Sequence, residues 1–420
     1  MWRQTTPLAA LSAVVAACAR SPADPPSAAS ASSARAPHAL EHHVVRFSDL
    51  PPPYETRSAD NPPVVVARPE GARLELPAGF HIAPYAEGGF DRPRWLAVAP
   101  NDDVFVADSG AGSIVVLRGL DADGRAAQRF TFARGLTLPF GIAFAPGFVY
   151  VGDTDAIVRF AYEPGDVQAR APAQTIAPLP GTGYHEHWTR NLLFAKDFKK
   201  LYVSVGSRTN DDAEGNPERG AVLQMNPDGT ERRIFVSGTR NPIGMAWRPG
   251  TDELWAVVQE RDGLGDDLAP DYLARLTGGG FYGWPFAYAG PHVDPRHQGE
   301  RPDLVAATRE PDLLVQAHVA LMDLVFYEGS MFPPDWRGDI IVSEHGSWNR
   351  SLRVGYGLAR VRMQGGRPVE GYDDFVTGWA LAPDRKEVWG RPVGLAVLAD
   401  GSVLVVDDGA LMVWRITFGG

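Results

Sequence analysis

A short apolar pattern recurs six times along this chain and constrains its fold more than any other feature. Each copy is a tetrapeptide whose second residue aligns with Leu192. The six copies are Trp95–Val98, Gly141–Phe144, Asn191–Phe194, Gly244–Trp247, Asp323–Phe326 and Gly394–Val397. A second apolar strand follows five of them within about a dozen residues. A longer loop with Pro333 and Pro334 connects the fifth copy to its partner, Asp339–Ser343.

Paired short strands that repeat about every 40–50 residues, with Gly, Asp and Pro turns between them, are typical of propeller blades. We therefore predict an all-β chain that folds as a six-bladed β-propeller. The alternative is a β-sandwich with accidental resemblance between its strands, which six phased copies disfavour. Wider spacing between the last three copies predicts loop insertions. Phe80–Tyr85 and Leu411–Phe418 both alternate like strands, so we expect the two ends of the domain to share one blade.

The first 61 residues differ from the rest in composition. Residues 1–18 have the pattern of a lipoprotein-type signal peptide, with Arg3, an apolar stretch and Cys18, the one cysteine of the chain. A plain secretory signal is the alternative. Residues 19–61, rich in Ala, Ser and Pro, are predicted to be a flexible linker, and residues 62–420 the propeller. We expect an exported, periplasmic protein that meets a membrane only through a lipid on Cys18.

The charge balance narrows the class of partner. The formal net charge is −11 without a basic stripe, which argues against nucleic acid as a partner. Most cationic side chains are arginines, and the planar guanidinium suits bidentate binding of carboxylates. Small anionic ligands are therefore the better candidates.

Loops that adjoin the inner strands of a propeller converge at one mouth of its channel. The segment Tyr184–Asn191 is such a loop, and it holds two histidines, a glutamate, a tryptophan and an arginine. Equivalent positions before the inner strands carry Arg92, His187, Arg240 with Asn241, and Arg391. The second strands end at Asp108, Asp153, Ser207 with Arg208, Gln259 with Glu260, Glu344 with His345, and Asp407 with Asp408. These arginines either bind an anionic ligand together or pair individually with neighbouring carboxylates as structural contacts.

The stretch Gln259–Asp267 contains four carboxylates and two glycines in nine residues. Oxygen-rich, bent loops suit a hard cation such as Ca²⁺, which accepts carbonyl and carboxylate ligands. A solvated acidic loop is the alternative, and composition does not separate the two.

Seven motifs together resemble the sorbosone dehydrogenase family, which is similar to the soluble glucose and aldose dehydrogenases that use pyrroloquinoline quinone (PQQ). The motifs are His187–Leu192, Leu201–Ser207, Arg240–Gly244, Glu260–Asp267, Gly280–Pro285, Glu344–Arg350 and Gly390–Gly394. The likeness runs from about Leu74 to the end of the chain. It implies a six-bladed propeller that holds PQQ and Ca²⁺ at the channel mouth.

The resemblance also implies roles for individual residues. His187 matches the general base, and Arg240 matches the arginine beside the quinone. Glu260, Arg261 and Asp262 match the calcium loop. We expect cofactor contacts from Arg190, Asn241 and Arg391, and from His345, Asn349 and Arg350, since no lysine occurs where the glucose enzymes use one. Ser207 stands where those enzymes place an acid.

The sequence therefore predicts a PQQ-dependent oxidoreductase of sugars or related aldehydes that passes electrons to a quinone or cytochrome acceptor. Two other classes remain open on the residues alone. One is a lactonase-type hydrolase, in which a caged metal activates water. The other is a non-catalytic carbohydrate-binding or scaffold propeller.

Overall fold

The computed structural model describes residues 40–181 and 187–419, which belong to one compact unit. Regular structure in this part of the chain is almost entirely strand, with one short helix, α1 (Pro302–Ala307), and three 3-10 turns: η1 (Phe47–Asp49), η2 (Pro295–His297) and η3 (Pro334–Trp336). No helix within the described residues has the length and apolar character needed to cross a membrane.

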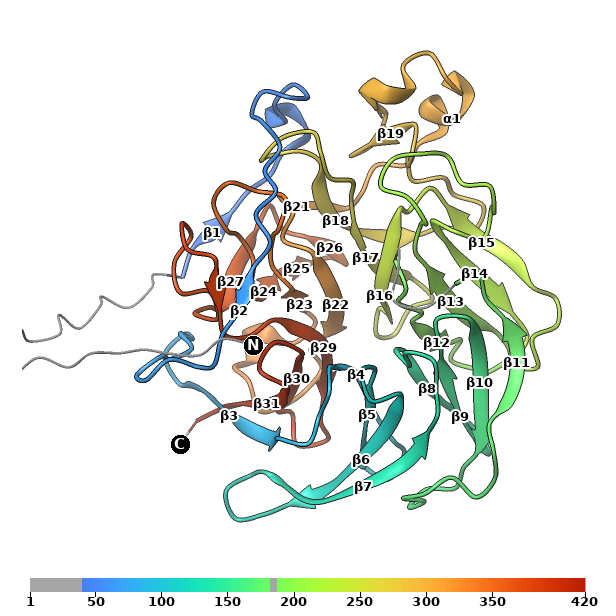
Figure 1. Cartoon of the computed structure of the whole chain (residues 1–420), viewed down its shortest axis with the longest axis vertical. Helices are drawn as coiled ribbons and strands as arrows, with labels where there is room; N and C mark the ends of the chain where they lie inside the picture. The colour runs from blue at the N-terminus through green and yellow to red at the C-terminus, as the bar shows by residue number, and fades with distance from the viewer. Residues whose placement is uncertain (1–39, 182–186, 420) are drawn as a thin grey trace, which may run out of the picture. The chain divides into compact units, whose positions relative to one another are not determined.

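Six antiparallel sheets surround a common centre, as predicted (Figure 1). The first three blades are β4 (Pro93–Val98), β5 (Val104–Asp108), β6 (Ser113–Leu120) and β7 (Ala126–Arg134); β8 (Ile142–Ala145), β9 (Phe148–Gly152), β10 (Ala156–Ala161) and β11 (Gln174–Pro178); and β12 (Leu192–Phe194), β13 (Leu201–Val205), β14 (Ala221–Met225) and β15 (Arg233–Ser237). The fourth is β16 (Asn241–Trp247), β17 (Leu254–Gln259), β18 (Pro270–Leu276) and β21 (Leu313–Ala317).

The fifth blade consists of β22 (Leu321–Phe326), β23 (Ile340–Glu344), β24 (Gly357–Val361), β27 (Tyr372–Val376) and β1 (His42–His43). The sixth consists of β29 (Pro392–Val397), β30 (Val403–Asp407), β31 (Met412–Phe418) and β3 (Phe80–Glu87). Strand β3 pairs with β31 from Phe80 opposite Phe418 to Glu87 opposite Met412. Strands from both ends of the domain therefore close the ring, as expected.

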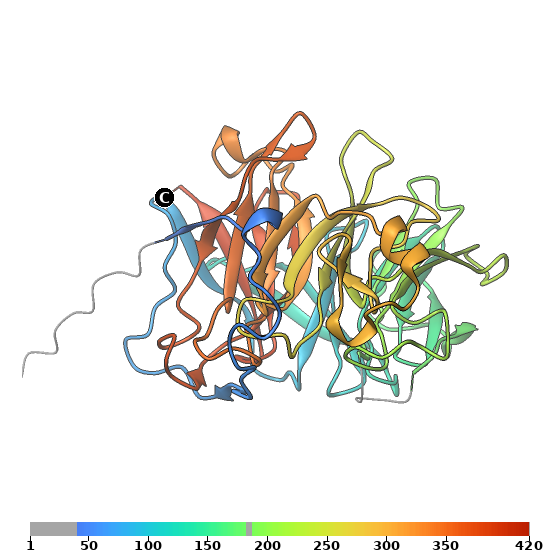
Figure 2. The same cartoon turned by 90° about the horizontal axis from the view of Figure 1, so that it is seen from above.

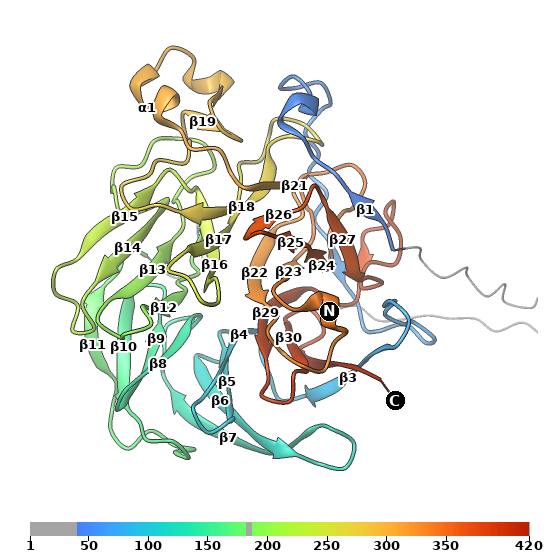
Figure 3. The ribbon, with the colours of Figure 1, turned by 180° about the vertical axis from the view of Figure 1, so that it is seen from behind.

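The six aligned tetrapeptides lie on the inner strands β4, β8, β12, β16, β22 and β29, which surround the centre of the ring in Figure 3. At the first position of the pattern, Asn191 and Asp323 hydrogen-bond to the neighbouring inner strand: Asn191 Nδ2 donates to Ile243 O (3.1 Å), and Asp323 Oδ2 accepts from Leu395 N (2.8 Å). Inner strands approach closely here, and this position holds glycine in three copies, a side chain that bonds to the next blade in two, and Trp95 in the first.

The middle strands carry the core. Every residue of β5, β13 and β30 is buried, because these strands have a neighbour on each edge and a blade on each face. Continuous apolar runs such as Val104–Ala107 fit this environment, in which no face of the strand meets water. Rigid sheets of this kind fix the loops at the channel mouth.

The predicted insertions are present. Residues 277–312 between β18 and β21 hold β19 (Ala287–Tyr288), β20 (His292–Val293), η2 and α1. A hairpin of β25 (Met363–Gln364) and β26 (Arg367–Pro368) separates β24 from β27, and β28 (Glu387–Val388) precedes the sixth blade. None of these insertions adds a blade.

The predicted linker extended to Asn61, whereas the structure places residues 40–61 against the propeller. Strand β1 pairs with β27, with His42 opposite Asp373, and β2 (Val64–Val65) pairs in parallel with β28. In Figure 1 this segment is the dark blue stretch that begins at β1, beside β27, and Figure 2 shows the same stretch from above. Its contacts combine backbone groups with a few side chains such as His42, His43 and Asn61, and composition does not reveal these pairings.

Candidate active site

A cavity of about 490 Å³ opens at the mouth between the third and fourth blades. Its walls are His187, Arg208, Thr209, Asn210, Arg240, Asp262, Gly263, Trp348 and Asn349. They come from the loops before β12 and after β13, the residue before β16, and the loops after β17 and β23. His187 and Arg240, the two predicted catalytic residues, thus share one cavity.

The structure fixes the tautomer of His187. Its Nδ1 lies 3.0 Å from the carbonyl oxygen of Ser207 and 2.9 Å from Ser207 Oγ. A carbonyl only accepts hydrogen bonds, and Ser207 Oγ uses its own proton on Thr209 O at 2.6 Å. Nδ1 therefore carries the proton, and Nε2 keeps a lone pair that no described residue binds.

His187 is neutral at physiological pH. Burial, followed by the positive charge of Arg240, lowers the pKa of His187 to about 3. Close packing holds the ring in place, because a Cβ on Gly206 would lie 2.4 Å from both His187 Cβ and Asn241 Oδ1. The site thus presents an oriented, unprotonated imidazole nitrogen.

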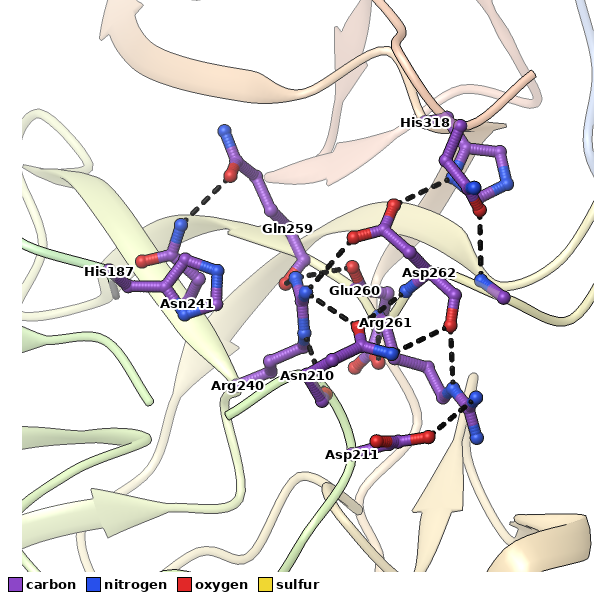
Figure 4. A network of polar contacts seen from close by, with 12 residues as sticks. His187, Asn210, Asp211, Arg240, Asn241, Gln259, Glu260, Arg261, Asp262 and His318 are labelled. Atoms are coloured by element: carbon purple, nitrogen blue, oxygen red, sulfur yellow. Dashed lines mark hydrogen bonds and ion pairs between the residues drawn. The ribbon is translucent and has the colours of Figure 1, made fainter. Parts of the chain in front are cut away.

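Arg240 is held by the protein on every side, as Figure 4 shows. Its Nε donates to Asn210 O (3.0 Å), Nη1 to Glu260 O (2.6 Å), and Nη2 to Asn210 Oδ1 (2.8 Å). Nη2 also pairs with Asp262 Oδ2 at 3.1 Å. Arg240 therefore contributes a fixed positive charge to the cavity rather than a set of free donors.

Asp262 and His318 extend this charged network. His318 Nδ1 lies 3.2 Å from Asp262 Oδ1, and His318 Nε2 lies 2.9 Å from Gly265 O. Both ring nitrogens face acceptors, so both carry protons. Burial opposes a charge on His318, but the hydrogen bond and negative charge of Asp262, together with Gly265 O and Asp271, outweigh burial and raise the pKa of His318. Asp262 thus has a cation on each side, and the network of Arg240, Asp262 and His318 has a net positive charge.

A second, smaller cavity of about 190 Å³ adjoins the first. Both are lined by His187, Arg240, Asp262 and Trp348, and the smaller one also by Gln259, Glu260, Asp271, His318 and Ala320. Burial raises the pKa of Glu260 to about 8 and that of Asp271 to about 6. Asp271 accepts the backbone N–H groups of Glu260 and Leu321 and so fixes the loop after β17.

The predicted calcium loop is present, but most of its oxygens bond to protein groups. The Asp262 carbonyl accepts from Asn210 Nδ2 (2.9 Å) and Arg261 Nε (3.1 Å). Arg261 itself pairs with Asp294 (2.7 Å) and Asp211 (2.9 Å). In residues 40–181 and 187–419, no three His, Cys, Asp or Glu side chains are grouped as a metal site. A metal role for Glu260, Arg261 and Asp262 stays a prediction.

Two of the six predicted cofactor-binding residues lie at the site. Asn349 lines the large cavity, and its Oδ1 accepts from Gly263 N at 2.9 Å. Asn241 lies against His187 across Gly206 and donates to Gln259 Oε1 at 2.8 Å. Its own Oδ1 is buried and has no partner among the described residues.

The other four do not line either cavity, and their polar groups contact the protein. Arg190 donates to the carbonyls of His187 (2.7 Å) and Thr189 (2.8 Å) and so shapes its own loop. Arg350 bonds to Asp266 O and Asp267, and Arg391 donates to His345 O at 3.1 Å. His345 Nε2 lies 2.8 Å from Asp408 Oδ1. These contacts favour the structural interpretation of each side chain.

Sequence reasoning missed Asn210 and His318 as members of the site. His318 lies three residues before inner strand β22, close to the position that identified His187 and Arg240, so a slightly wider count would have found it. Asn210 carried no comparable signal, because it follows β13 in an irregular loop. Tyr184, His185 and Glu186 of the predicted polar loop lie outside the described residues.

Comparison with known proteins places these features in a family. The sequence profile of glucose/sorbosone dehydrogenases matches residues 150–370. A PQQ-dependent pyranose dehydrogenase of Coprinopsis cinerea is 24% identical over 405 residues, covering 80% of this chain but 53% of that protein, so the chain spans about half of its length. An aldose sugar dehydrogenase of Escherichia coli is 29% identical over 134 residues, or 30% of this chain and 33% of that one.

Solved structures share the fold. The PQQ domain of the Coprinopsis cinerea pyranose dehydrogenase, in its holo form, matches with a TM-score of 0.71 at 20% identity, covering 83% of this chain and 98% of that one. The PQQ-bound aldose sugar dehydrogenase of Streptomyces coelicolor matches with a TM-score of 0.59 at 18% identity, covering 84% and 99%. The profile match covers more than half of the sequence, and the chain belongs to the glucose/sorbosone dehydrogenase family.

Proposed function

We propose that this protein is a PQQ-dependent dehydrogenase that oxidises a sugar or a related aldehyde. One observation carries the proposal: the free Nε2 of His187 shares a cavity with the fixed cation of Arg240. A base beside a fixed positive charge suits removal of a hydroxyl proton while negative charge develops on the reacting oxygen. Family membership supports the same reaction class.

The cavity fits a small planar anion. Its volume of about 490 Å³ is within the range of roughly 300–1,000 Å³ that small-molecule sites occupy. PQQ carries carboxylates, and the walls hold the guanidinium of Arg240 and that of exposed Arg208, for which the described residues provide no acidic partner. Arg208 has donors free for a bidentate contact, while Arg240 supplies charge.

Each residue of the site then has a defined task. When bound, PQQ supplies the carbonyl chemistry that accepts hydride from the substrate carbon. His187 Nε2 accepts the proton of the substrate hydroxyl, and Ser207 holds the ring through Nδ1–H. Arg240, kept in position by Asn210 and Glu260 O, stabilises the negative charge that develops on the substrate oxygen.

Calcium fits the described residues less well than PQQ. The Asp262 carbonyl already accepts two hydrogen bonds, and the Glu260 carbonyl accepts one from Arg240. A carbonyl oxygen has two lone pairs, so a calcium ion on the Asp262 carbonyl would have to displace Asn210 or Arg261, whereas the Glu260 carbonyl keeps one lone pair beside its bond from Arg240. We therefore give calcium no step in the reaction and treat it as a variable of the experiment.

The proposal also covers the substrates, the electron acceptor and the location of the enzyme. Sugars with a free anomeric hydroxyl, sorbosone and simple aldehydes form the substrate class. Electrons would pass to a quinone or a cytochrome. Export and a lipid on Cys18 would place the enzyme in the periplasm at a membrane surface, which labelling with radioactive palmitate would test.

The decisive experiment combines binding with turnover. The purified apo-protein is titrated with PQQ in the presence of Ca²⁺ and, separately, of EDTA, and dye reduction is then followed across aldoses, sorbosone and simple aldehydes. Saturable PQQ binding with quinone-dependent reduction of dye by at least one substrate is expected. Hydrolysis of lactones without any quinone-dependent turnover would instead favour the hydrolase.

A further inference from the structure

Residues 54–61, here called the N-terminal strap, run from the region of β1 to β2 and contact two loops of the candidate site. One is residues 262–267, which follows β17, and the other is residues 347–353, which follows β23. Both loops contribute walls to the large cavity. The strap is more than 200 residues away from either loop in sequence, so only the fold brings the three together.

The first set of contacts fixes loop 262–267. Tyr54 N donates to Leu264 O at 2.7 Å, and Thr56 Oγ1 accepts from Asp266 N at 2.7 Å. Gly265 lies between these two bonds with φ +121, and a Cβ there would be 2.9 Å from Thr56 Oγ1. The strap thus packs directly on the bend that follows Asp262 and Gly263.

The second set fixes loop 347–353. Asn61 N donates to Trp348 O (2.9 Å), and Asn61 Nδ2 donates to the carbonyls of Arg350 (3.1 Å) and Ser351 (3.2 Å). Asn349 Nδ2 donates to Ala59 O. Trp348 and Asn349 line the cavity. The strap therefore holds this stretch of the loop through Trp348 O, the Asn349 side chain and the carbonyls of Arg350 and Ser351.

The two loops also bond to each other beneath the strap. Gly263 N donates to Asn349 Oδ1 at 2.9 Å, Arg350 Nη1 donates to Asp266 O at 2.7 Å, and Ser351 N donates to Asp266 Oδ1 at 2.9 Å. The strap and the two loops form one hydrogen-bonded unit. A change in a strap residue should therefore alter the position of the loops that line the cavity.

We propose that the N-terminal strap is a positioning element of the ligand site, in which Asn61 and Thr56 hold the Trp348 and Asp262 walls at the spacing that the ligand requires. The proposal rests on the proposed function only for the identity of the ligand, PQQ. The pairing of β1 with β27 and of β2 with β28 anchors the segment on both sides. Loss of one strap bond therefore loosens the walls without releasing the segment.

The test uses the full chain with single substitutions. Asn61→Ala removes the two bonds that Asn61 Nδ2 donates and the one that Asn61 Oδ1 accepts from Arg353, and it keeps the backbone bond to Trp348 O. Thr56→Val removes the acceptor for Asp266 N while keeping the shape of the side chain. Thr56→Ser restores that acceptor. His42→Ala is the matched control, because it changes the same N-terminal segment at a pair with Asp373 (2.9 Å) far from the loops in sequence. Each protein is measured for PQQ dissociation constant, turnover at saturating PQQ, and hydrogen exchange of residues 262–267 and 347–353.

The expected result is a split between affinity and rate. Asn61→Ala raises the PQQ dissociation constant by about 5- to 10-fold and Thr56→Val by about 3-fold, as hydrogen-bond energies suggest. Amide exchange in both loops becomes about 10-fold faster, since the opening they share costs less. Turnover at saturation stays within about twofold. Thr56→Ser and His42→Ala behave like the unchanged protein.

The two proposals fail in different ways. If the unchanged protein binds no PQQ, the proposed function falls, and hydrogen exchange alone decides the strap: faster exchange in both loops supports it, and unchanged exchange overturns it. If PQQ binds and Asn61→Ala changes neither affinity nor exchange, the strap proposal is wrong while the proposed function stands. An equal effect of His42→Ala would also overturn it, because the effect would then be general loosening of the segment.

Discussion

Two histidine clusters lie at the channel mouth in the described part of the chain, and one of them lines the two cavities described above. The cavity cluster is His187, Ser207, Arg240 and Asp262, and the packed cluster is Arg94, His345 and Asp408. In the packed cluster, His345 Nε2 lies 2.8 Å from Asp408 Oδ1 and 3.3 Å from Arg94 Nη1. Arg94 also pairs with Asp408 and lies 5.4 Å from the ring centroid of Trp188.

Both clusters contain a histidine, an arginine and an aspartate, and they differ in which atoms face the two described cavities. Burial lowers the pKa of both histidines to about 3, with Arg240 as the next cause for His187 and Arg391 for His345. His187 uses Nδ1 on Ser207 and keeps Nε2 free. His345 directs Nε2 at Asp408 and Arg94, and it lines neither of the two cavities. A lowered pKa alone therefore does not identify the base.

Arg240 and Arg391 occupy equivalent positions, one residue before the inner strands β16 and β29, but they differ in their neighbours. Arg240 lines the cavity and is held by polar groups of the fourth blade. Arg391 donates to His345 O, and its guanidinium lies 5.8 Å from the ring centroid of Tyr356. The repeat places both arginines at the mouth, and their neighbours decide which one meets a ligand.

The largest effect that would test the comparison is the loss of the base. His187→Asn should lower turnover of the PQQ-loaded enzyme by about 10²- to 10⁴-fold, because no other histidine among the described residues lines the large cavity. Steady-state kinetics together with thermal melting would show this. His345→Asn is the matched control, and per folded molecule it should keep turnover within about 10-fold. Equal losses in both variants would remove the distinction between the clusters.

The packed cluster should matter most for stability. Burial opposes ionisation of Asp408, but His345 and Arg94 outweigh burial and lower its pKa. Asp408→Asn leaves Arg94 buried without a counter-charge, so the free energy of unfolding should fall by about 3–5 kcal/mol. Chemical denaturation would measure this. A loss below about 1 kcal/mol would mean that Arg94 finds water or another partner.

Stability on the packed side should also depend on pH. Burial raises the pKa of Glu344, at the end of β23, to about 8. Between pH of about 4.5 and 8, the unfolded chain releases this proton and the folded chain keeps it. The folded state therefore loses stability as pH rises, by at most about 1.4 kcal/mol per pH unit. Glu344→Gln should flatten the dependence of unfolding free energy on pH, whereas the exposed Glu163→Gln should not.

The smallest expected effect concerns the partner of the base. Ser207→Ala removes one of the two acceptors of His187 Nδ1–H and should lower turnover by about 3- to 10-fold. Ser207→Asp places a carboxylate beside the ring, which should raise the pKa of His187 and move the acid limb of the pH–rate profile upward. A profile that does not move in Ser207→Asp would show that another group sets the acid limb.

The architecture was predictable from the sequence because it depends on local pattern. Each inner strand carries the same apolar alternation, and the first position of the pattern, as at Asn191 and Asp323, holds a residue suited to close contact between blades. A repeat of this kind fixes the number of blades and the position of the mouth. It also predicts that His187 and Arg240 lie at the same mouth, and the two residues share one cavity.

The N-terminal strap was not predictable in this way. Its composition is typical of a linker, and many of its contacts use backbone groups that every sequence has, such as those of Tyr54 and Ala59. The partners of these groups lie on loops more than 200 residues away. Neither periodicity nor composition carries information about such a pairing.

The sequence by itself therefore determined the ring and the set of polar residues at its mouth, because strand periodicity and turn residues act over a few positions. Only the tertiary structure decided which of these residues keep an atom for a ligand. Arg240 is saturated by Asn210 and Glu260, and His187 keeps Nε2 because Ser207 takes Nδ1. Loops that are distant in sequence bond to some donors and acceptors of a side chain and leave the others available for a ligand. Those bonds form only in the folded molecule.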